Sequence, residues 1–158
     1  MQKITPFLWF DGKAEEATKL YTSIFKDSKI IDIVYWDKGG PFPSDQVQTA
    51  IFELNGMRFY AFDAGPMFKF TEAISMMVEC KDQEEVDYYW NAFTADGGQE
   101  SQCGWVKDKF GVSWQITPKI LMDYNGGKDR AKAGRVMAAM MKMKKIIIAD
   151  LEKAAEGS

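Results

Sequence analysis

Two side chains of this sequence, Glu79 and Cys103, could take part in catalysis if their surroundings activated them. A carboxyl group can act as a general acid or base when burial raises its pKa, and a thiol can act as a nucleophile when a positive neighbour lowers its pKa. Lys107 and Lys109 are close to Cys103 in the sequence, but that spacing does not place them beside it in space. The alternative interpretation is a solvated charge at a rim for Glu79 and an inert, buried thiol for Cys103.

The sequence contains no histidine. This removes the commonest catalytic base and the commonest ligand of transition metals together. Any metal would need carboxylate, cysteine or carbonyl ligands. We expect no metal and no other cofactor, and the sequence leaves open whether the protein is an enzyme.

A second group of residues suits the binding of a small molecule. Aromatic rings can stack on a planar ligand, and an arginine can clamp a carboxylate or a phosphate. The alternative is ordinary packing for the rings and a surface ion pair with Glu79 or another acid for the arginine. The candidate ligand-binding residues are Trp9, Trp36, Arg58, Tyr60, Phe62, Ser75, Met77 and Gln115.

Composition narrows the class of protein. The 158 residues are 46% hydrophobic and 27% charged, which suits one soluble domain with a real core. A net charge of -3 gives no basic face for nucleic acid. The sequence shows no membrane span and no signal peptide, and its two cysteines suit a reducing compartment, so we expect a cytoplasmic protein.

Two segments of the chain repeat one order of patterns: strand, helix and three strands. Asn55-Gly56 indicates a tight hairpin, and Asp82 followed by Glu85 indicates a capped helix start. A glycine- and proline-rich loop is expected at 37–45, and 64–72 links the two halves. In the first half the patterns cover 4–10, 14–25, 29–36, 46–54 and 57–63; in the second they cover 73–80, a helix from 82 to about 97, strands within 99–107, and 111–117.

The pattern of the tail from Pro118 indicates an added helical segment. It predicts a helix over 129–144, followed by a short β-branched run at 146–148 and a last helical turn. Met137, Met140 and Met141 fit a buried stripe of that helix, in the core or at a subunit interface.

Strand parity predicts two unlike sheet faces. One set of alternate positions is wholly apolar and should lie under the helices: Leu8, Phe10, Phe59, Ala61, Met76, Val78, Cys80, Val112, Trp114 and Ile116. The other set mixes aromatic and polar groups, which is typical of the lining of a wet cavity; packing on the tail or on another subunit is the alternative. That set is Thr5, Phe7, Trp9, Arg58, Tyr60, Phe62, Ser75, Met77, Glu79, Ser113, Gln115 and Thr117.

Several motifs resemble the PhnB-like family, a group labelled 3-demethylubiquinone-9 3-methyltransferase within the vicinal-oxygen-chelate superfamily. They are Phe7-Leu8-Trp9-Phe10-Asp11-Gly12, Glu15-Glu16-Ala17, Tyr21, Ser23-Ile24-Phe25, Leu54-Asn55-Gly56, the long block from Cys103 to Gln115, and Arg135-Val136-Met137. The resemblance covers nearly the whole chain. It implies an α+β fold of paired βαβββ modules, a cupped mixed sheet of the glyoxalase/bleomycin-resistance/dihydroxybiphenyl-dioxygenase type, and a homodimer.

The resemblance also bears on metal and on methyl transfer. Metal-using members draw four ligands from strand positions that correspond here to Thr5, Tyr60, Ser75 and Gln115. None is His, Asp or Glu, so we expect no tightly bound transition metal. No glycine-rich turn for a methyl donor follows a strand, and Asn125-Gly126-Gly127 reads as a loop, so the sequence does not support the methyltransferase label.

We therefore expect a single domain, residues 1–158, with modules 1–63 and 73–117 and a C-terminal helical extension over 118–158. The expected function is metal-free binding of a small molecule in an aromatic and polar cavity. The alternatives are an enzyme acting on a quinone-like or carbonyl substrate, such as a methyltransferase, another transferase or a lyase, and a structural homodimer without a ligand. Neither nucleic acid nor a membrane is an expected partner.

Overall fold

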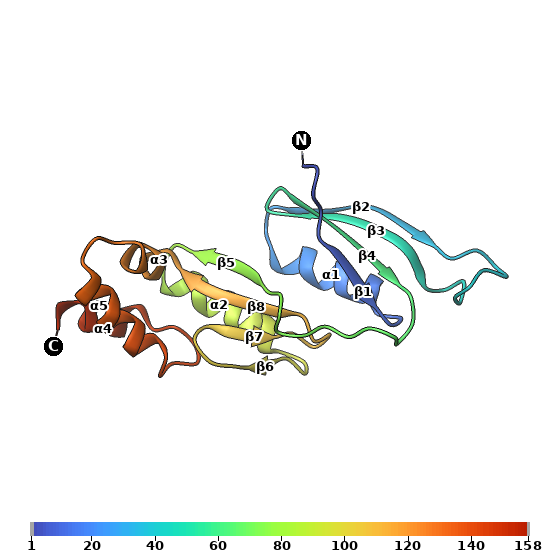
Figure 1. The fold of residues 1–158 in the computed structure, drawn as a ribbon. Coiled ribbons are helices and arrows are strands. Elements are labelled where there is room, and N and C mark those ends of the chain that lie inside the picture. The colour runs from blue at the N-terminus through green and yellow to red at the C-terminus, as the bar shows by residue number, and fades with distance from the viewer. Residues whose placement is uncertain (1, 158) are drawn as a thin grey trace. The chain divides into compact units, whose positions relative to one another are not determined.

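The computed structural model describes residues 2–157, which form two compact units. The first unit ends at Phe70 and the second begins at Thr71. Each unit contains one four-stranded sheet and a helix that follows its first strand (Figure 1). Both have the order strand, helix and three strands, which is the repeat that the sequence patterns predict.

The first unit is built on the sheet order β1-β4-β3-β2. β1 and β4 are parallel, and the other neighbours are antiparallel. Parallel pairing of β1 with β4 brings together residues about fifty positions apart in the chain, such as Phe7 and Tyr60. The elements are β1 (Phe7–Phe10), α1 (Ala14–Ile24), β2 (Ser28–Tyr35), β3 (Val47–Leu54) and β4 (Met57–Asp63).

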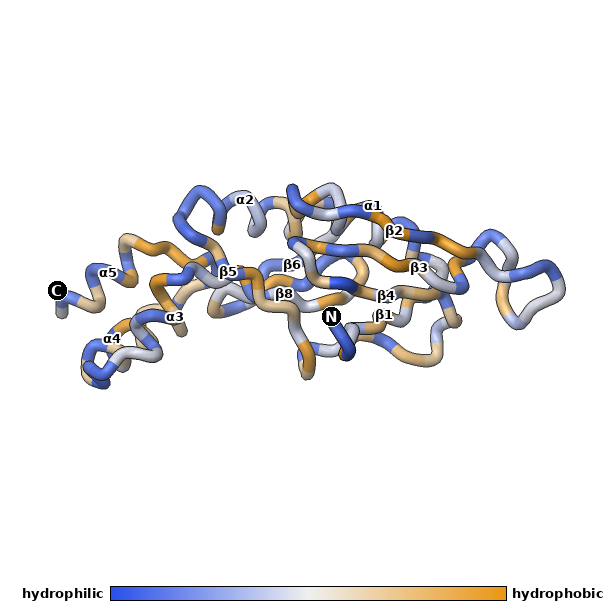
Figure 2. Tube along the Cα trace, turned by 90° about the horizontal axis from the view of Figure 1, so that it is seen from above, coloured by the Kyte–Doolittle hydropathy of each residue, from blue (hydrophilic) through white to orange (hydrophobic). Residues whose placement is uncertain are grey.

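The local signals of the first unit act as their chemistry predicts. Asn55 and Gly56 both have positive φ angles, 49° and 79°, and Leu54 pairs with Met57. This is a two-residue hairpin loop, whose twist requires left-handed backbone that Asn and Gly adopt readily. The connection between β2 and β3, expected to be a loop, is mostly blue and pale in Figure 2 because polar residues, glycine and proline dominate it.

The second unit repeats the topology with shorter strands. Its sheet order is β5-β8-β7-β6, with β5 and β8 parallel. The outer pair β6–β7 is joined by only two register positions. The elements are β5 (Met76–Cys80), α2 (Gln83–Thr94), β6 (Gln99–Glu100), β7 (Trp105–Lys107) and β8 (Ser113–Pro118).

Helix α2 begins and ends close to the predicted places. Asp82 is the N-cap, and its carboxylate accepts a hydrogen bond from the Glu85 N–H at 2.9 Å. Glu85 in turn accepts from the Lys81 N–H at 2.7 Å, so two otherwise free donors are satisfied. The chain leaves the helix through Gly98, where an added Cβ would lie 2.0 Å from the Phe93 carbonyl oxygen, so only glycine fits.

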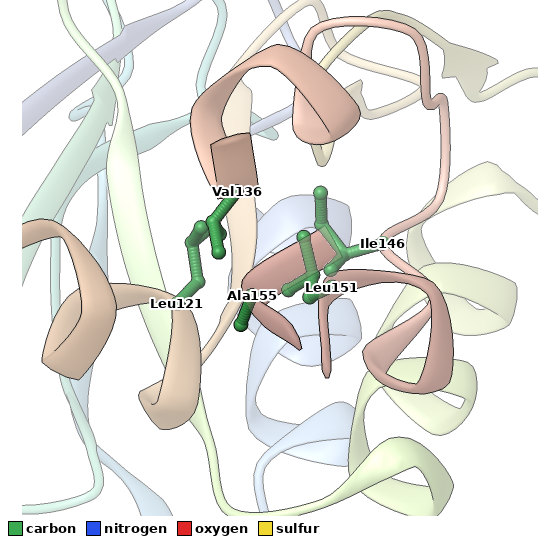
Figure 3. Packing of buried hydrophobic residues seen from close by; sticks show 5 residues of the cluster. All are labelled: Leu121, Val136, Ile146, Leu151 and Ala155. Atoms are coloured by element: carbon green, nitrogen blue, oxygen red, sulfur yellow. The ribbon is translucent and has the colours of Figure 1, made fainter. Parts of the chain in front are cut away.

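The tail folds as three helices: α3 (Lys119–Asn125), α4 (Arg130–Met140) and α5 (Ile148–Glu156). Figure 3 shows their buried cluster, in which Leu121, Val136, Ile146, Leu151 and Ala155 lie together. Helix α4 begins after Asp129, near the predicted start, but ends at Met140 and not at Lys144. Helix α3 was not predicted from the sequence. Helix α5, predicted as a single turn, has nine residues.

The β-branched run 146–148 leads into the last helix: Ile146 belongs to the buried cluster, and α5 starts at Ile148. Of the three methionines predicted to lie in the core or at a subunit interface, Met140 packs against the cluster. Met137 and Met141 are 38% and 64% exposed, so they are not in the core, and their place at an interface stays a prediction. The buried face of α4 is made by the smaller residues Ala133 and Val136, and Val136 belongs to the buried cluster.

The tail is bound to the rest of the second unit by a small set of polar contacts. The backbone N–H groups of Cys103 and Gly104 donate to the carbonyl oxygens of Met143 and Lys144, each at 2.8 Å. The Gln83 side chain donates to the Ile146 carbonyl at 3.0 Å and accepts from the Ile148 N–H at 2.8 Å. An ion pair also links the tail to α2: the Lys145 ammonium lies 2.8 Å from the Asp87 carboxylate. Among residues 2–157, no helix is long and apolar enough to cross a membrane.

Candidate functional site

The two sheet faces divide as strand parity predicts. Of the apolar set, every residue is buried except Met76, which is half-buried. The mixed set is half-buried or exposed, with two exceptions in β8, Ser113 and Thr117, which are buried. We call this mixed set the open face of each sheet. It is the surface of each unit on which candidate binding residues can meet a ligand.

The open face of the first sheet carries a continuous cluster of aromatic rings. Phe7 meets Tyr60 and Phe62 with ring centroids 5.7 and 4.8 Å apart. Trp9 meets Phe62 at 5.1 Å and Phe68 at 4.9 Å. All four contacts are edge-to-face, a favoured geometry for aromatic pairs. The parallel register, with Phe7 beside Tyr60 and Trp9 beside Phe62, produces the cluster.

The structure joins three of the predicted binding residues in this aromatic cluster: Trp9, Tyr60 and Phe62. Trp9 is fixed further because its indole N–H donates to the Gly65 carbonyl at 2.9 Å. Trp36 is held elsewhere in the unit: its indole N–H donates to the Asp63 carbonyl at 2.9 Å, and its ring meets Phe42 at 5.1 Å. The sequence did not single out Phe68, which lies in the segment expected to be a linker.

Arg58 lies on an exposed part of β4 and pairs with an acid. Its guanidinium is 3.5 Å from the Glu53 carboxylate across the β3–β4 pair. The Gln2 side chain accepts from the Arg58 N–H and donates to the Arg58 carbonyl, each at 2.9 Å. This is the surface ion pair named as the alternative, with Glu53 as the acid, and such exposed pairs contribute little to stability.

The open face of the second sheet is polar where that of the first is aromatic. Gln115 donates through its side-chain amide to the Ser75 hydroxyl at 2.9 Å. In register, Gln115 lies between Met77 on β5 and Trp105 on β7. The structure therefore brings the predicted residues Ser75, Met77 and Gln115 together within this unit.

The two candidate catalytic residues have different surroundings. Glu79 is exposed on β5, opposite Thr117 on β8, so its carboxylate is solvated. Cys103 is half-buried in a left-handed turn with φ 60°, fixed by the bond from its N–H to Met143. The other cysteine, Cys80, is fully buried, and that burial, followed by nearby carboxylates, raises the pKa of its thiol to about 12.

Two buried carboxylates, Asp63 and Asp108, were missed by the sequence reading. Asp63 accepts from the N–H groups of Ala14 and Val47, each at 2.9 Å. Strand parity could have shown that Asp63 is buried, because it falls on the same alternate positions of β4 as the buried residues Phe59 and Ala61. Asp108 accepts from the backbone N–H groups of 110 and 112 and from the Trp114 indole N–H at 2.9 to 3.0 Å. Both carboxylates are occupied by structural hydrogen bonds.

A small hollow lies on the second unit beside β6, β7 and β8. Its volume is about 110 Å³, whereas sites for drug-sized ligands span roughly 300–1,000 Å³. It is lined by Glu72, Gln99, Glu100, Ser101, Trp105, Val106, Lys107 and Ser113. The structure does not show the large aromatic and polar cavity that the sequence predicts. The aromatic rings instead form a partly exposed cluster on the first unit.

The four residues that the family resemblance suggests as metal-ligand positions, Thr5, Tyr60, Ser75 and Gln115, do not offer suitable ligands. Tyr60 belongs to the aromatic cluster, and Thr5 precedes β1. Ser75 and Gln115 are hydrogen-bonded to each other. These are neutral oxygen and amide groups, a poor set for a divalent transition ion. Within 2–157, no group of three or more His, Cys, Asp or Glu residues could hold a metal ion.

The repeated βαβββ units, each with a parallel pair of strands next to its helix, define an α+β fold of the glyoxalase and bleomycin-resistance type. The chain belongs to the 3-demethylubiquinone-9 3-methyltransferase family, whose model matches residues 2–117. Residues 118–158, which contain the three tail helices, lie beyond that match.

Solved structures agree with this assignment. A PhnB protein of Bacillus cereus with the same methyltransferase label is 40% identical, with a TM-score of 0.70, over 74% of this chain and 99% of its own. A Pseudomonas aeruginosa protein, 20% identical, matches 75% of this chain and 98% of its own with a TM-score of 0.62. The fosfomycin resistance protein FosX of Listeria monocytogenes, 16% identical, matches 72% and 87% with a TM-score of 0.53. No curated protein matches the sequence.

Proposed function

We propose that this protein binds a small planar molecule, without a metal, on the open face of its first sheet. The observation that carries this proposal is the aromatic cluster of Phe7, Trp9, Tyr60, Phe62 and Phe68. Two of its rings, Phe7 and Phe68, are 52% and 60% exposed. Contiguous apolar surface of this kind is characteristic of a binding site, because covering it with a flat ring removes it from water.

The family gives a reason to begin with quinones. Its printed description refers to a demethylubiquinone, and the Bacillus cereus relative carries the same label. A quinone ring is flat and offers carbonyl oxygens at its edge, so stacking on aromatic side chains suits it. The proposal concerns binding only, since the chain offers no glycine-rich turn for a methyl donor.

Titration with 1,4-naphthoquinone, followed by calorimetry and by the chemical shifts of the Trp9 indole, tests the proposal. Phe7→Ala removes an exposed ring of the cluster and should weaken binding by about tenfold, the effect of losing one stacked contact. Tyr88→Ala is the matched control, because Tyr88 is an exposed aromatic residue of α2 in the other unit. Equal binding by wild type and Phe7→Ala, or no binding by wild type, would contradict the proposal.

The other two expected functions give different outcomes in the same experiments. A structural homodimer that covers the aromatic cluster would show no naphthoquinone binding and a Phe7→Ala variant that dissociates in sedimentation. An enzyme would consume a bound quinone or carbonyl compound, and Glu79→Gln or Cys103→Ser would abolish the turnover while leaving binding unchanged. A homodimer that leaves the cluster open is compatible with binding, and is the oligomer we expect.

A further inference from the structure

The small hollow of the second unit has features of a binding site that are independent of the aromatic cluster. Ser113 lines it and is 2% exposed. Within residues 2–157, no hydrogen bond of the Ser113 hydroxyl is found, and the fully enclosed side-chain hydroxyl without a partner is that of Thr18, so the Ser113 hydroxyl is open to the hollow. A polar group of this kind, facing a hollow of about 110 Å³, is available to a ligand of a few heavy atoms.

The charges around the hollow decide which ligand it suits. Lys107 forms an ion pair with Glu72, and the hydrogen bond from Lys107 lowers the pKa of the Glu72 carboxyl. These two charges offset each other. Among residues 2–157, the Glu100 carboxylate accepts one side-chain hydrogen bond, from the neutral Trp90 indole N–H at 3.1 Å. The lining therefore has one carboxylate in excess, and it favours a cation over an anion.

The remaining walls suit an organic ammonium group. Trp105 lines the hollow, and the face of a tryptophan ring attracts a cation within about 6 Å. A primary ammonium has three N–H donors, enough for Glu100 and Ser113 together. We propose that this hollow binds the ammonium end of a small amine, with Glu100 as the charge partner, Ser113 as a hydrogen-bond acceptor and Trp105 as the aromatic wall.

Small ions that differ in charge and in N–H groups should bind the hollow with different affinities. Methylammonium has the charge, the N–H groups and the size that the hollow requires. Tetramethylammonium keeps the charge but has no N–H group for Ser113, so it should bind at least about fivefold more weakly. Acetate has the opposite charge and should not bind.

Two-dimensional NMR of the full chain tests the site, with the Trp105 indole and Ser113 amide resonances as reporters and chloride concentration held constant. Methylammonium should shift both resonances to saturation. Glu100→Gln keeps an acceptor for Trp90 but removes the charge, and should weaken binding by about tenfold. Ser113→Ala should weaken it by about fivefold. Glu84→Gln, at an exposed acid of α2 outside the lining, is the control and should leave the titration unchanged.

Three results would overturn the proposal: no saturable shift with methylammonium, stronger shifts with acetate, or equal methylammonium binding by wild type and Glu100→Gln. Unaltered amide spectra away from the hollow show that each variant is folded, so lost binding reports on the site. Glu100→Gln should also leave naphthoquinone binding intact. Failure at the hollow is thereby distinguished from failure at the aromatic cluster.

Discussion

The two units have the same order of elements but start their helices by different means. Helix α2 is capped locally by Asp82, the residue just before it. Helix α1 follows Lys13, which provides no side-chain cap, and its first N–H group donates instead to Asp63, the last residue of β4. A short-range cap can be read in the sequence, whereas the cap of α1 comes from a residue 49 positions away that the fold delivers.

The open faces of the two sheets also differ in the side chains that they present. The first sheet presents rings, and the second presents the Gln115–Ser75 pair and the Lys107–Glu72 ion pair. Repetition of the backbone therefore does not repeat the surface chemistry. The ligands that we propose differ accordingly: a flat molecule for the first unit and a small ammonium group for the second.

The largest expected effect concerns Cys80, which reports on the second unit alone because both cysteines belong to it. Its pKa is raised from the ordinary value of 9.0 to about 12. At pH 8 the folded protein should then contain about a thousandth of the Cys80 thiolate of an unburied thiol. In a Cys103→Ser variant, a disulfide reagent should react only on opening of the unit. Reaction of the folded protein at the rate of a free thiol would contradict this.

The same pKa shift predicts how stability depends on pH. The folded state keeps the Cys80 proton more tightly than the unfolded state, so the stabilisation is complete below pH 9 and is lost as the pH rises from 9 towards 12. Urea unfolding should show a falling free energy over that range. A Cys80→Ala variant should lack this part of the fall, which separates it from the titration of lysine and tyrosine side chains.

Asp63→Ala tests the long-range cap of the first unit. It leaves the buried N–H groups of Ala14 and Val47 without an acceptor, and should cost about 3–5 kcal/mol of unfolding free energy in urea. Asp63→Asn keeps one acceptor oxygen and should lose less. A loss below about 1 kcal/mol for Asp63→Ala would show that the carboxylate does not hold the helix and β3 together.

Asp82→Ala tests the local cap of the second unit and should be milder. One exposed hydrogen bond to Glu85 is lost, at about 1 kcal/mol, a typical value for an N-cap. Asp82→Ser keeps an acceptor and serves as the control. If Asp82→Ala destabilised the protein as much as Asp63→Ala, the distinction between the two helix starts would fail.

The smallest expected effect is a gain in the free energy of unfolding, not a loss. The Thr18 hydroxyl of α1 is fully buried and has no hydrogen-bond partner in the described chain. Thr18→Val replaces it with a methyl group of similar size and should stabilise the protein by about 1 kcal/mol in urea unfolding. Thr22→Val is the control: the Thr22 hydroxyl donates to the Thr18 carbonyl at 2.8 Å, so its loss should bring no gain.

Much of the fold could be predicted because its signals are local. Alternation assigned the buried faces of the strands, the Asn55-Gly56 pair fixed a hairpin, and Asp82 marked a helix start. The tail was harder, because its helices are short, with seven, eleven and nine residues, and α4 buries only the small residues Ala133 and Val136. Its exposed methionines, Met137 and Met141, are apolar, as is the buried Val136, so residue type alone did not show which of them is buried.

The candidate site was predicted in part for the same reason. Parity placed Trp9, Tyr60 and Phe62 on one face, and Ser75, Met77 and Gln115 on another. It did not predict that Arg58 would pair with Glu53, or that Trp36 would bond to the Asp63 carbonyl. These partners depend on strand register and on loop paths, which side-chain type does not determine.

Taken alone, the sequence determined which side of each strand is apolar, because neighbouring residues point to opposite faces whatever the strand pairs with. It also determined that histidine chemistry is absent. Only the tertiary structure decided which rings meet, which acid caps α1 and which side chains line the hollow. The ring contacts and the cap of α1 join residues about fifty positions apart, and their geometry exists only once β1 has paired with β4. The hollow needs β6, β7 and β8 to pair before its side chains come together.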